Sequence, residues 1–84
     1  MERVPVVSSM VKSVGFDGVA MEIEFVVKEG RPPSIYLIQE ATPTGELAML
    51  HSAMMVPDAS IGQIYNSRVR PNQNFVITKV EDAA

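Results

Sequence analysis

The segment from Val19 to Val27 constrains the fold more than any other part of the chain. Apolar side chains stand at Val19, Met21, Ile23, Phe25 and Val27, with Glu22 and Glu24 between them. This period of two is typical of a β-strand with one buried and one solvated face. Asp17-Gly18 comes just before it, a pair typical of type I′ hairpin turns, in which both central residues need positive φ. We therefore predict a hairpin with its tip at Asp17-Gly18.

The remaining elements follow from turn residues and apolar spacing. Ser8 to Phe16 is the predicted partner strand, and the segment 28–33, with Gly30, Pro32 and Pro33, is a loop. Ser34 to Gln39 is a third strand. We expect a helix from an N-cap at Thr42-Pro43 to about Met55, with Leu47, Leu50 and Met54 at helical spacing. A shorter helix spans residues 60–69 before Pro71, and residues 75–80 form a final strand. The pattern predicts one α+β domain over 1–84, an antiparallel sheet of three to four strands with two short helices on one face.

Composition excludes several classes of function. The chain has 84 residues, no cysteine and a formal net charge of -3, which excludes disulfides, thiolate metal sites and cysteine nucleophiles. The acidic total argues against extended binding to a DNA backbone. Its apolar runs are short and Met1 to Pro5 does not resemble a signal peptide, so we expect a cytoplasmic protein that is not in a membrane. We expect a homo-oligomer, because the predicted core is thin and because Val26 and Val76 face the surface. The six methionines agree with this, although methionine also fills core gaps.

The richest set of candidate binding residues lies in the predicted second helix. Gly62, Asn66 and Arg70 share one face of an α-helix at spacings of four residues. Asn66 can donate and accept hydrogen bonds as recognition of a base requires. An arginine holds phosphate bidentately, and a tyrosine ring stacks on a base. The same residues also suit an ordinary packed helix, and the sequence leaves both interpretations open. The set consists of Ser60, Gly62, Tyr65, Asn66, Arg68 and Arg70, with Arg31 as a further positive group.

A second candidate set is Ser8, Ser9 and Ser13, whose hydroxyl and amide groups suit phosphate oxygens. Serine closes local turns just as readily, and we favour that interpretation. His51 has no partner that would make it a general base, and Glu22 and Glu24 read as the solvated face of a sheet. No phosphate loop, catalytic triad or metal-binding motif is present. We therefore predict no catalytic residues, no metal and no cofactor, and a protein that is not an enzyme.

Two stretches resemble the KTSC domain, a family named for its place at the C-terminus of some lysyl-tRNA synthetases. Ser8 to Asp17 is similar to the opening of the family, with paired serines and then Gly15-Phe16-Asp17. Ser60 to Arg70 resembles its closing run around Ser60, Gly62 and Asn66, and Tyr36 stands where a central tyrosine pair begins. The likeness covers about residues 7–70. The chain differs from the family at Ile38 and Ile64, where aromatic residues are expected, and in a longer segment from Thr42 to Ala59.

The resemblance implies RNA contact at best, or a stand-alone copy of the kind found in bacteria and phages. Combined with the residues above, it favours a non-catalytic domain that binds a nucleotide-type anion, such as a nucleotide signal or a short RNA element, at Arg70, Asn66, Tyr65, Arg68, Ser8 and Ser9. In a phage, such a protein would act in the host cytoplasm and counter host defence by sequestering the signal. The alternative is an acidic protein–protein interaction module that inhibits a host enzyme through Asp58, Glu22, Glu24, Glu81 and Asp82.

Overall fold

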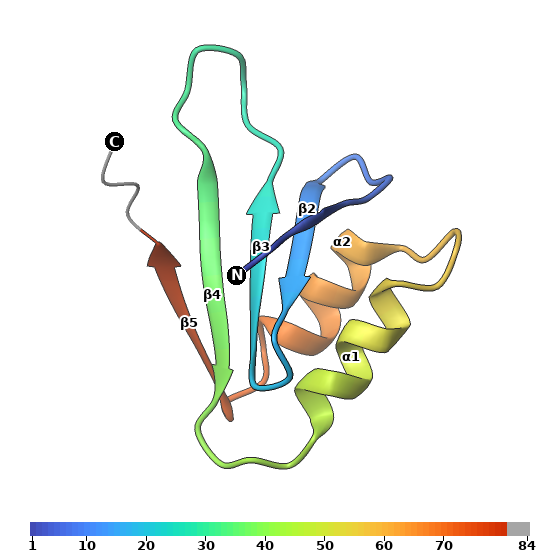
Figure 1. Ribbon diagram of the computed structural model, residues 1–84, viewed down its shortest axis with the longest axis vertical. Helices are drawn as coiled ribbons and strands as arrows, with labels where there is room; N and C mark the ends of the chain where they lie inside the picture. The colour runs from blue at the N-terminus through green and yellow to red at the C-terminus, as the bar shows by residue number, and fades with distance from the viewer. Residues whose placement is uncertain (81–84) are drawn as a thin grey trace.

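The computed structural model describes residues 1–80, which form a five-stranded antiparallel sheet with helices packed on it (Figure 1). Each strand pairs with the next one in the chain, so the order across the sheet is β1-β2-β3-β4-β5. The elements are β1 (Val4–Pro5), β2 (Val11–Phe16), β3 (Ala20–Phe25), β4 (Ser34–Glu40), α1 (Glu46–Met54), α2 (Ile61–Ile64), the π-helical turn η1 (Tyr65–Val69) and β5 (Phe75–Val80). The predicted α+β class is confirmed, whereas three to four strands was an underestimate.

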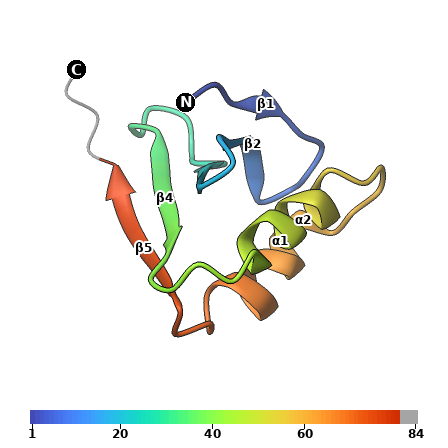
Figure 2. The same ribbon diagram turned by 60° about the horizontal axis from the view of Figure 1, so that its bottom comes forward.

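The extra strand is β1, which pairs with β2 through Val4 opposite Val14 and Pro5 opposite Ser13. The chain just before β1 lies so close to β2 that a Cβ on Gly15 would be 2.5 Å from the backbone oxygen of Glu2. Figure 2 shows β1 at the margin of the sheet beside β2. A two-residue strand that ends in proline leaves no alternating pattern in the sequence, so sequence periodicity did not reveal it.

The predicted hairpin tip at Asp17-Gly18 is confirmed, because β2 ends at Phe16 and β3 begins at Ala20. Gly18 has φ 97°, but the only non-glycine residue with positive φ in the described chain is Asp58. The turn is therefore not type I′. Asp17 instead closes it with its side chain, whose Oδ1 accepts the amide N–H of Val19 and of Ala20, each at 2.8 Å. These two bonds hold the pKa of Asp17 below its usual value.

The alternating strand is shorter than predicted. Met21 and Ile23 are fully buried and Phe25 packs beside them. Val19 and Val27 lie outside β3 and are 74% and 39% exposed, because Val19 belongs to the turn that Asp17 closes. The first predicted strand is also shorter, since β2 begins at Val11 and not at Ser8.

Helix α1 starts at Glu46 with Gly45 as N-cap, so the predicted start at Thr42-Pro43 is wrong. The cause is Asn74, which lies 32 residues away in the sequence. Its Oδ1 accepts the amide N–H of Thr42 at 2.9 Å, and its Nδ2 donates to the Thr42 carbonyl at 2.8 Å. A residue whose two backbone groups are held beside the start of β5 is not free to begin a helix.

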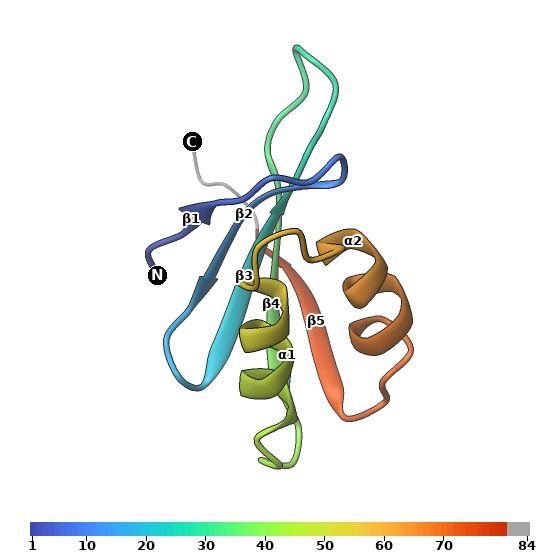
Figure 3. The same cartoon turned by 90° about the vertical axis from the view of Figure 1, so that its right-hand side faces the viewer.

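One core lies between the helices and a single face of the sheet, as Figures 2 and 3 show. The helices contribute Leu47, Leu50, Met54, Ile61, Tyr65 and Val69, and the strands contribute Val11, Val14, Met21, Ile23, Ile38 and Phe75. Burying a side chain of this size stabilises a fold by about 1.5–3 kcal/mol. This packing fixes the start of α2 against the turn that precedes β2, where the candidate site lies.

Candidate functional site

A hollow of about 570 Å³ lies where the N-terminal segment meets the start of α2. We call it the serine hollow. All ten residues that line it are uncharged, and they come from segments about fifty positions apart in the sequence. They are Ser8, Ser9, Met10, Ala59, Ser60, Ile61, Gly62, Gln63, Asn66 and Ser67. Both motifs that the sequence singled out therefore meet in one place.

The Ser8 side chain already has a structural role in this hollow. Its Oγ accepts the amide N–H of Met10 and of Val11, each at 3.1 Å, which is the local turn that the sequence favoured. The Oγ of Ser67 donates to the carbonyl of Gln63 at 2.7 Å. Ser60 is the N-cap of α2 but makes no side-chain capping bond, so its hydroxyl is left for a ligand or for water.

Gly62 brings the helix against the N-terminal segment. A Cβ placed there would lie 3.0 Å from the Sδ and 3.1 Å from the Cβ of Met10. Beside it the Nδ2 of Asn66 lies 3.7 Å from the same Met10 sulfur, a weak contact that leaves the amide oxygen free for other partners. The space that glycine opens is thus taken by Met10, which forms the wall of the hollow between Gly62 and Asn66.

Tyr65, another predicted site residue, belongs to the core. It is 8% exposed, and its ring packs edge-on against Phe25, with centroids 5.0 Å apart. Phe25 makes a similar contact with Tyr36 at 5.6 Å. Burial raises the pKa of Tyr65, and the positive charge of Arg70 opposes that shift in part. A ring held in this way does not stack on a base in the serine hollow.

The two predicted arginines also lie away from the hollow. The amide N–H of Arg70 donates to the Tyr65 carbonyl at 2.9 Å, the i→i+5 bond of a π-helical turn. Arg70, at the end of that turn, is exposed and is not among the residues that line the hollow. Arg68 lines a separate hollow of about 340 Å³ together with Glu46, Met49 and Asn72, among others. The structure brings Ser8, Ser9 and Asn66 together and separates them from Tyr65, Arg68 and Arg70.

Sequence reasoning missed Met10, Gln63 and Ser67 as lining residues. Gln63 lies three positions before Asn66 and Ser67 directly follows it. A helical wheel drawn around Asn66 would therefore have found both. Met10 gave no such signal, because its role depends on the approach of two distant segments.

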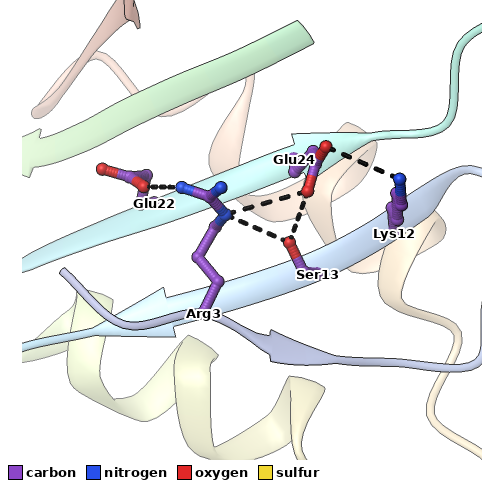
Figure 4. Close-up of polar contacts among 5 residues, drawn as sticks. All are labelled: Arg3, Lys12, Ser13, Glu22 and Glu24. Carbon is purple, nitrogen blue, oxygen red and sulfur yellow. Dashed lines mark hydrogen bonds and ion pairs between the residues drawn. The ribbon is translucent and has the colours of Figure 1, made fainter. Parts of the chain in front are cut away.

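The opposite face of the sheet carries a network of charged residues (Figure 4). Arg3 forms an ion pair with Glu22 and donates from Nε to the Oγ of Ser13 at 3.2 Å. Ser13 in turn donates to Glu24 at 3.0 Å, and Lys12 lies 3.9 Å from the same carboxylate. The side chains of Glu22 and Glu24 are only 15% and 14% exposed. The sequence predicts a solvated face at these two residues, but they instead hold the N-terminal segment that carries Arg3.

His51 is a packing residue, as the sequence indicated. Its ring stacks on Phe16 at 4.7 Å with 29° between the planes, and burial lowers its pKa.

Among residues 1–80 no group of three or more histidine, aspartate or glutamate side chains is placed to hold a metal ion. Within the same range, no helix has the length and apolar character needed to cross a bilayer.

Comparison with family models, with curated proteins and with solved structures gave no match for this chain. The resemblance to the KTSC domain therefore stays a prediction that rests on the two motifs. The candidate site stands on its own geometry.

Proposed function

We propose that this protein is a non-catalytic binding domain whose serine hollow holds a small polar ligand of the nucleotide class. The observation that carries the proposal is the convergence of Ser8-Ser9 and Ser60–Ser67 on one hollow of about 570 Å³. Ligand sites are concave, with apolar walls and a few convergent polar groups. This hollow has that character, with walls from Met10, Ile61 and Ala59.

The chemistry of the lining suits a phosphate or sugar group better than a cation. Hydroxyls at Ser9 and Ser60 and the amide of Gln63 can donate hydrogen bonds. The first amide N–H groups of α2 have no intrahelical acceptor. Among residues 1–80 no carboxylate lines the hollow, so its described lining carries no charge that repels an anion. Asn66 offers both a donor and an acceptor, as the edge of a base requires.

This proposal assigns the arginines a smaller role than the sequence suggested. Arg68 and Arg70 lie outside the lining, so recognition rests on neutral donors, without the ion pair and the bidentate contact that a guanidinium would add. We therefore expect modest affinity and a weak dependence on salt. Sequestration of a signalling nucleotide, as a phage counter-defence protein would require, then depends on a high concentration of the protein.

The alternative, an acidic module that inhibits a host enzyme, has less support. Its proposed residues include Glu22, which is held by Arg3, and Glu24, which is held by Arg3, Ser13 and Lys12. Asp58 is exposed in the connection between α1 and α2. Glu81 and Asp82 lie outside the described residues.

Two amide-to-acid substitutions test the hollow as an anion site. Asn66→Asp places a negative charge in the lining, and Gln73→Glu makes the same change in charge on an exposed turn outside it. A like charge about 4 Å away costs roughly 1 kcal/mol in bulk water and about 4 kcal/mol near a protein surface. Asn66→Asp should therefore weaken nucleotide binding about ten-fold or more, while Gln73→Glu leaves it unchanged.

The readout is native mass spectrometry of the protein from cells, followed by titration with the nucleotide that it retains. Absorbance gives a simpler check, because the chain has no tryptophan and two tyrosines, so a bound base raises the 260/280 ratio markedly. If Asn66→Asp binds as tightly as the parent, or if both variants lose affinity equally, the hollow is not the anion site.

A further inference from the structure

The outer edge of β5 is one of the two margins of the sheet. In Figure 1 β5 forms one margin of the sheet, while the helices lie over the opposite side. Among residues 1–80 no strand pairs with this edge, since β4 is the only neighbour of β5. β5 has six residues, Phe-Val-Ile-Thr-Lys-Val, with one charge and no proline. A long edge strand of this kind is a template for pairing with another chain.

The other margin of the sheet is protected in a way that β5 is not. β1 has two residues, and one of them is Pro5, which has no N–H to offer. Short edge strands and edge prolines are common ways to block edge-to-edge association. The contrast between the two margins indicates that the free edge of β5 is kept for a partner.

The hydrogen-bond pattern tells which backbone groups of β5 are free. Ala41 donates its amide N–H to the carbonyl of Asn74 at 2.7 Å, and the β4–β5 register continues as Gln39 opposite Val76 and Leu37 opposite Thr78. Hydrogen-bonded pairs alternate along an antiparallel ladder. Val76, Thr78 and Val80 therefore direct their backbone groups toward β4, and Ile77 and Lys79 direct theirs outward. Of Phe75 only the carbonyl is available, because its amide N–H donates to the Asn72 carbonyl at 3.2 Å.

We infer that the protein forms a two-fold symmetric homodimer in which the β5 strands of two copies pair antiparallel, with the axis at Ile77. In this register Ile77 lies opposite Ile77, and Phe75 lies opposite Lys79 of the second copy. Ile77 and its counterpart then exchange two backbone hydrogen bonds, and the Lys79 N–H of each copy donates to the Phe75 carbonyl of the other. The result is one continuous sheet of ten strands, twice the five of one copy, with the helices of both copies on the same side.

The charges agree with this register. Lys79 is the one charged side chain in β5, and it meets Phe75 instead of a second lysine. Glu40 pairs with Phe75 on β4, so Lys79 of the second copy falls in the same row as Glu40, two strands or about 10 Å away. A long lysine side chain reaches across part of that gap, so the two charges attract each other. On the other face Val76, 48% exposed in one copy, meets Thr78.

Cysteine substitutions locate the axis, because the native chain has no cysteine. Ile77→Cys places a thiol opposite its own copy, with Cα atoms about 5.5 Å apart in a hydrogen-bonded pair, which a disulfide spans. Val76→Cys is the matched control, since Val76 lies opposite Thr78 and two Val76 residues are more than about 7 Å apart. On a non-reducing gel Ile77→Cys should give twice the 9.2 kDa of the chain and Val76→Cys should not.

Amide hydrogen exchange tests the unmodified protein. In the dimer the amides of Ile77 and Lys79 should exchange as slowly as those of Val76 and Thr78, whereas in a monomer the first two exchange quickly. Lys79→Pro removes one outward N–H and should convert the dimer to monomer in sedimentation analysis, while Lys79→Ala keeps the N–H and the dimer.

Rapid exchange at Ile77 and Lys79, or a particle of 9.2 kDa for the unmodified protein at tens of micromolar, would overturn the proposal. Cross-linking at Val76 instead of Ile77 would overturn the register. The dimer stands whether or not the serine hollow binds an anion, because β5 contributes no residue to that hollow.

Discussion

Replacing Gly15 by alanine should destabilise the domain, although alanine is ordinarily the better residue inside a strand. Glycine in a strand interior costs roughly 0.5–1 kcal/mol relative to alanine, so propensity alone predicts a gain in stability. The new Cβ would, however, lie 2.5 Å from the Glu2 carbonyl oxygen and 3.1 Å from the Cγ of Arg3. The nearest atom belongs to the backbone and does not move aside by side-chain rotation. The segment that includes β1 must therefore move away from β2.

The size of the effect follows from the contacts that this movement breaks. They are the pairing of Val4 with Val14 and of Pro5 with Ser13, together with the bonds of Arg3 to Glu22 and Ser13. A backbone hydrogen bond contributes about 1 kcal/mol net and a bond to a charged group about 1.5–3 kcal/mol. The released segment regains conformational entropy of about 1–2 kcal/mol per residue, which offsets part of the loss. We expect a net loss of about 1–3 kcal/mol, or a melting temperature lower by about 5–20 °C.

The assay is urea unfolding followed by circular dichroism, on Gly15→Ala, Arg3→Ala and the double variant. Arg3→Ala should destabilise the parent protein. It should add little to Gly15→Ala, because in that variant the N-terminal segment with Arg3 has already left the sheet. Gly18→Ala is the matched control: it has φ 97° and no heavy atom within 4 Å of the added Cβ, so it tests backbone strain without a clash. If Gly15→Ala matches or exceeds the parent in stability, or if the Arg3 effect is undiminished in the double variant, the account of β1 is wrong.

Three further predictions concern the turn at Asp17-Gly18, the pKa of His51 and the hydrogen bonds of Asn74 to Thr42. Gly18→Val should lower the free energy of unfolding by about 1 kcal/mol or more, because a β-branched residue resists positive φ; Gly18→Asn should lose less, and an unchanged melting temperature for Gly18→Val would contradict this. Since burial lowers the pKa of His51 in the folded state, the unfolded chain binds the proton more readily, and stability should fall as pH drops below about 6.5. His51→Phe should flatten that slope in melts between pH 7.5 and 5, and an identical slope would exclude His51 as its source. Asn74→Ala removes the two bonds to Thr42 and should lower the free energy of unfolding, measured by urea unfolding, by about 1–2 kcal/mol. Asn74→Asp keeps the acceptor alone and should give an intermediate loss.

The parts of the fold that sequence predicted are those that local physics decides. The alternation at Met21, Ile23 and Phe25 and the turn at Asp17-Gly18 depend on neighbours a few residues away. The start of α1 depended instead on Asn74, which captures Thr42 from across the chain. The strand β1 depended on the clearance over Gly15 and on the pairing of Arg3 with Glu22. Neither interaction leaves a period or a turn signal in the sequence.

The candidate site was predictable to a similar degree. Ser8, Ser9 and Asn66 were chosen from the sequence, and the structure places all three around the serine hollow. Arg70 was assigned to the same face as Asn66 on the assumption of an α-helix throughout. The segment is instead a π-helical turn with the i→i+5 bond from Arg70 to Tyr65, and Arg70 does not line the hollow. No pattern of residue types predicts a π-turn. Tyr65 was assigned to a ligand because an aromatic residue looks alike in sequence whether it fills a core or binds a base.

The order of strands in the sheet also sets an order of events in folding. β2, β3 and β4 are joined by short connections, so their hairpins close quickly and locally. β5 pairs with β4 only after the chain has travelled through both helices, a detour from Ala41 to Asn74 whose ends the Asn74 side chain ties together. Closing a loop of that length costs entropy before any contact repays it. We expect the three central strands to assemble first and β5 last, so that the margin open to other molecules is completed only when the rest of the domain is already in place.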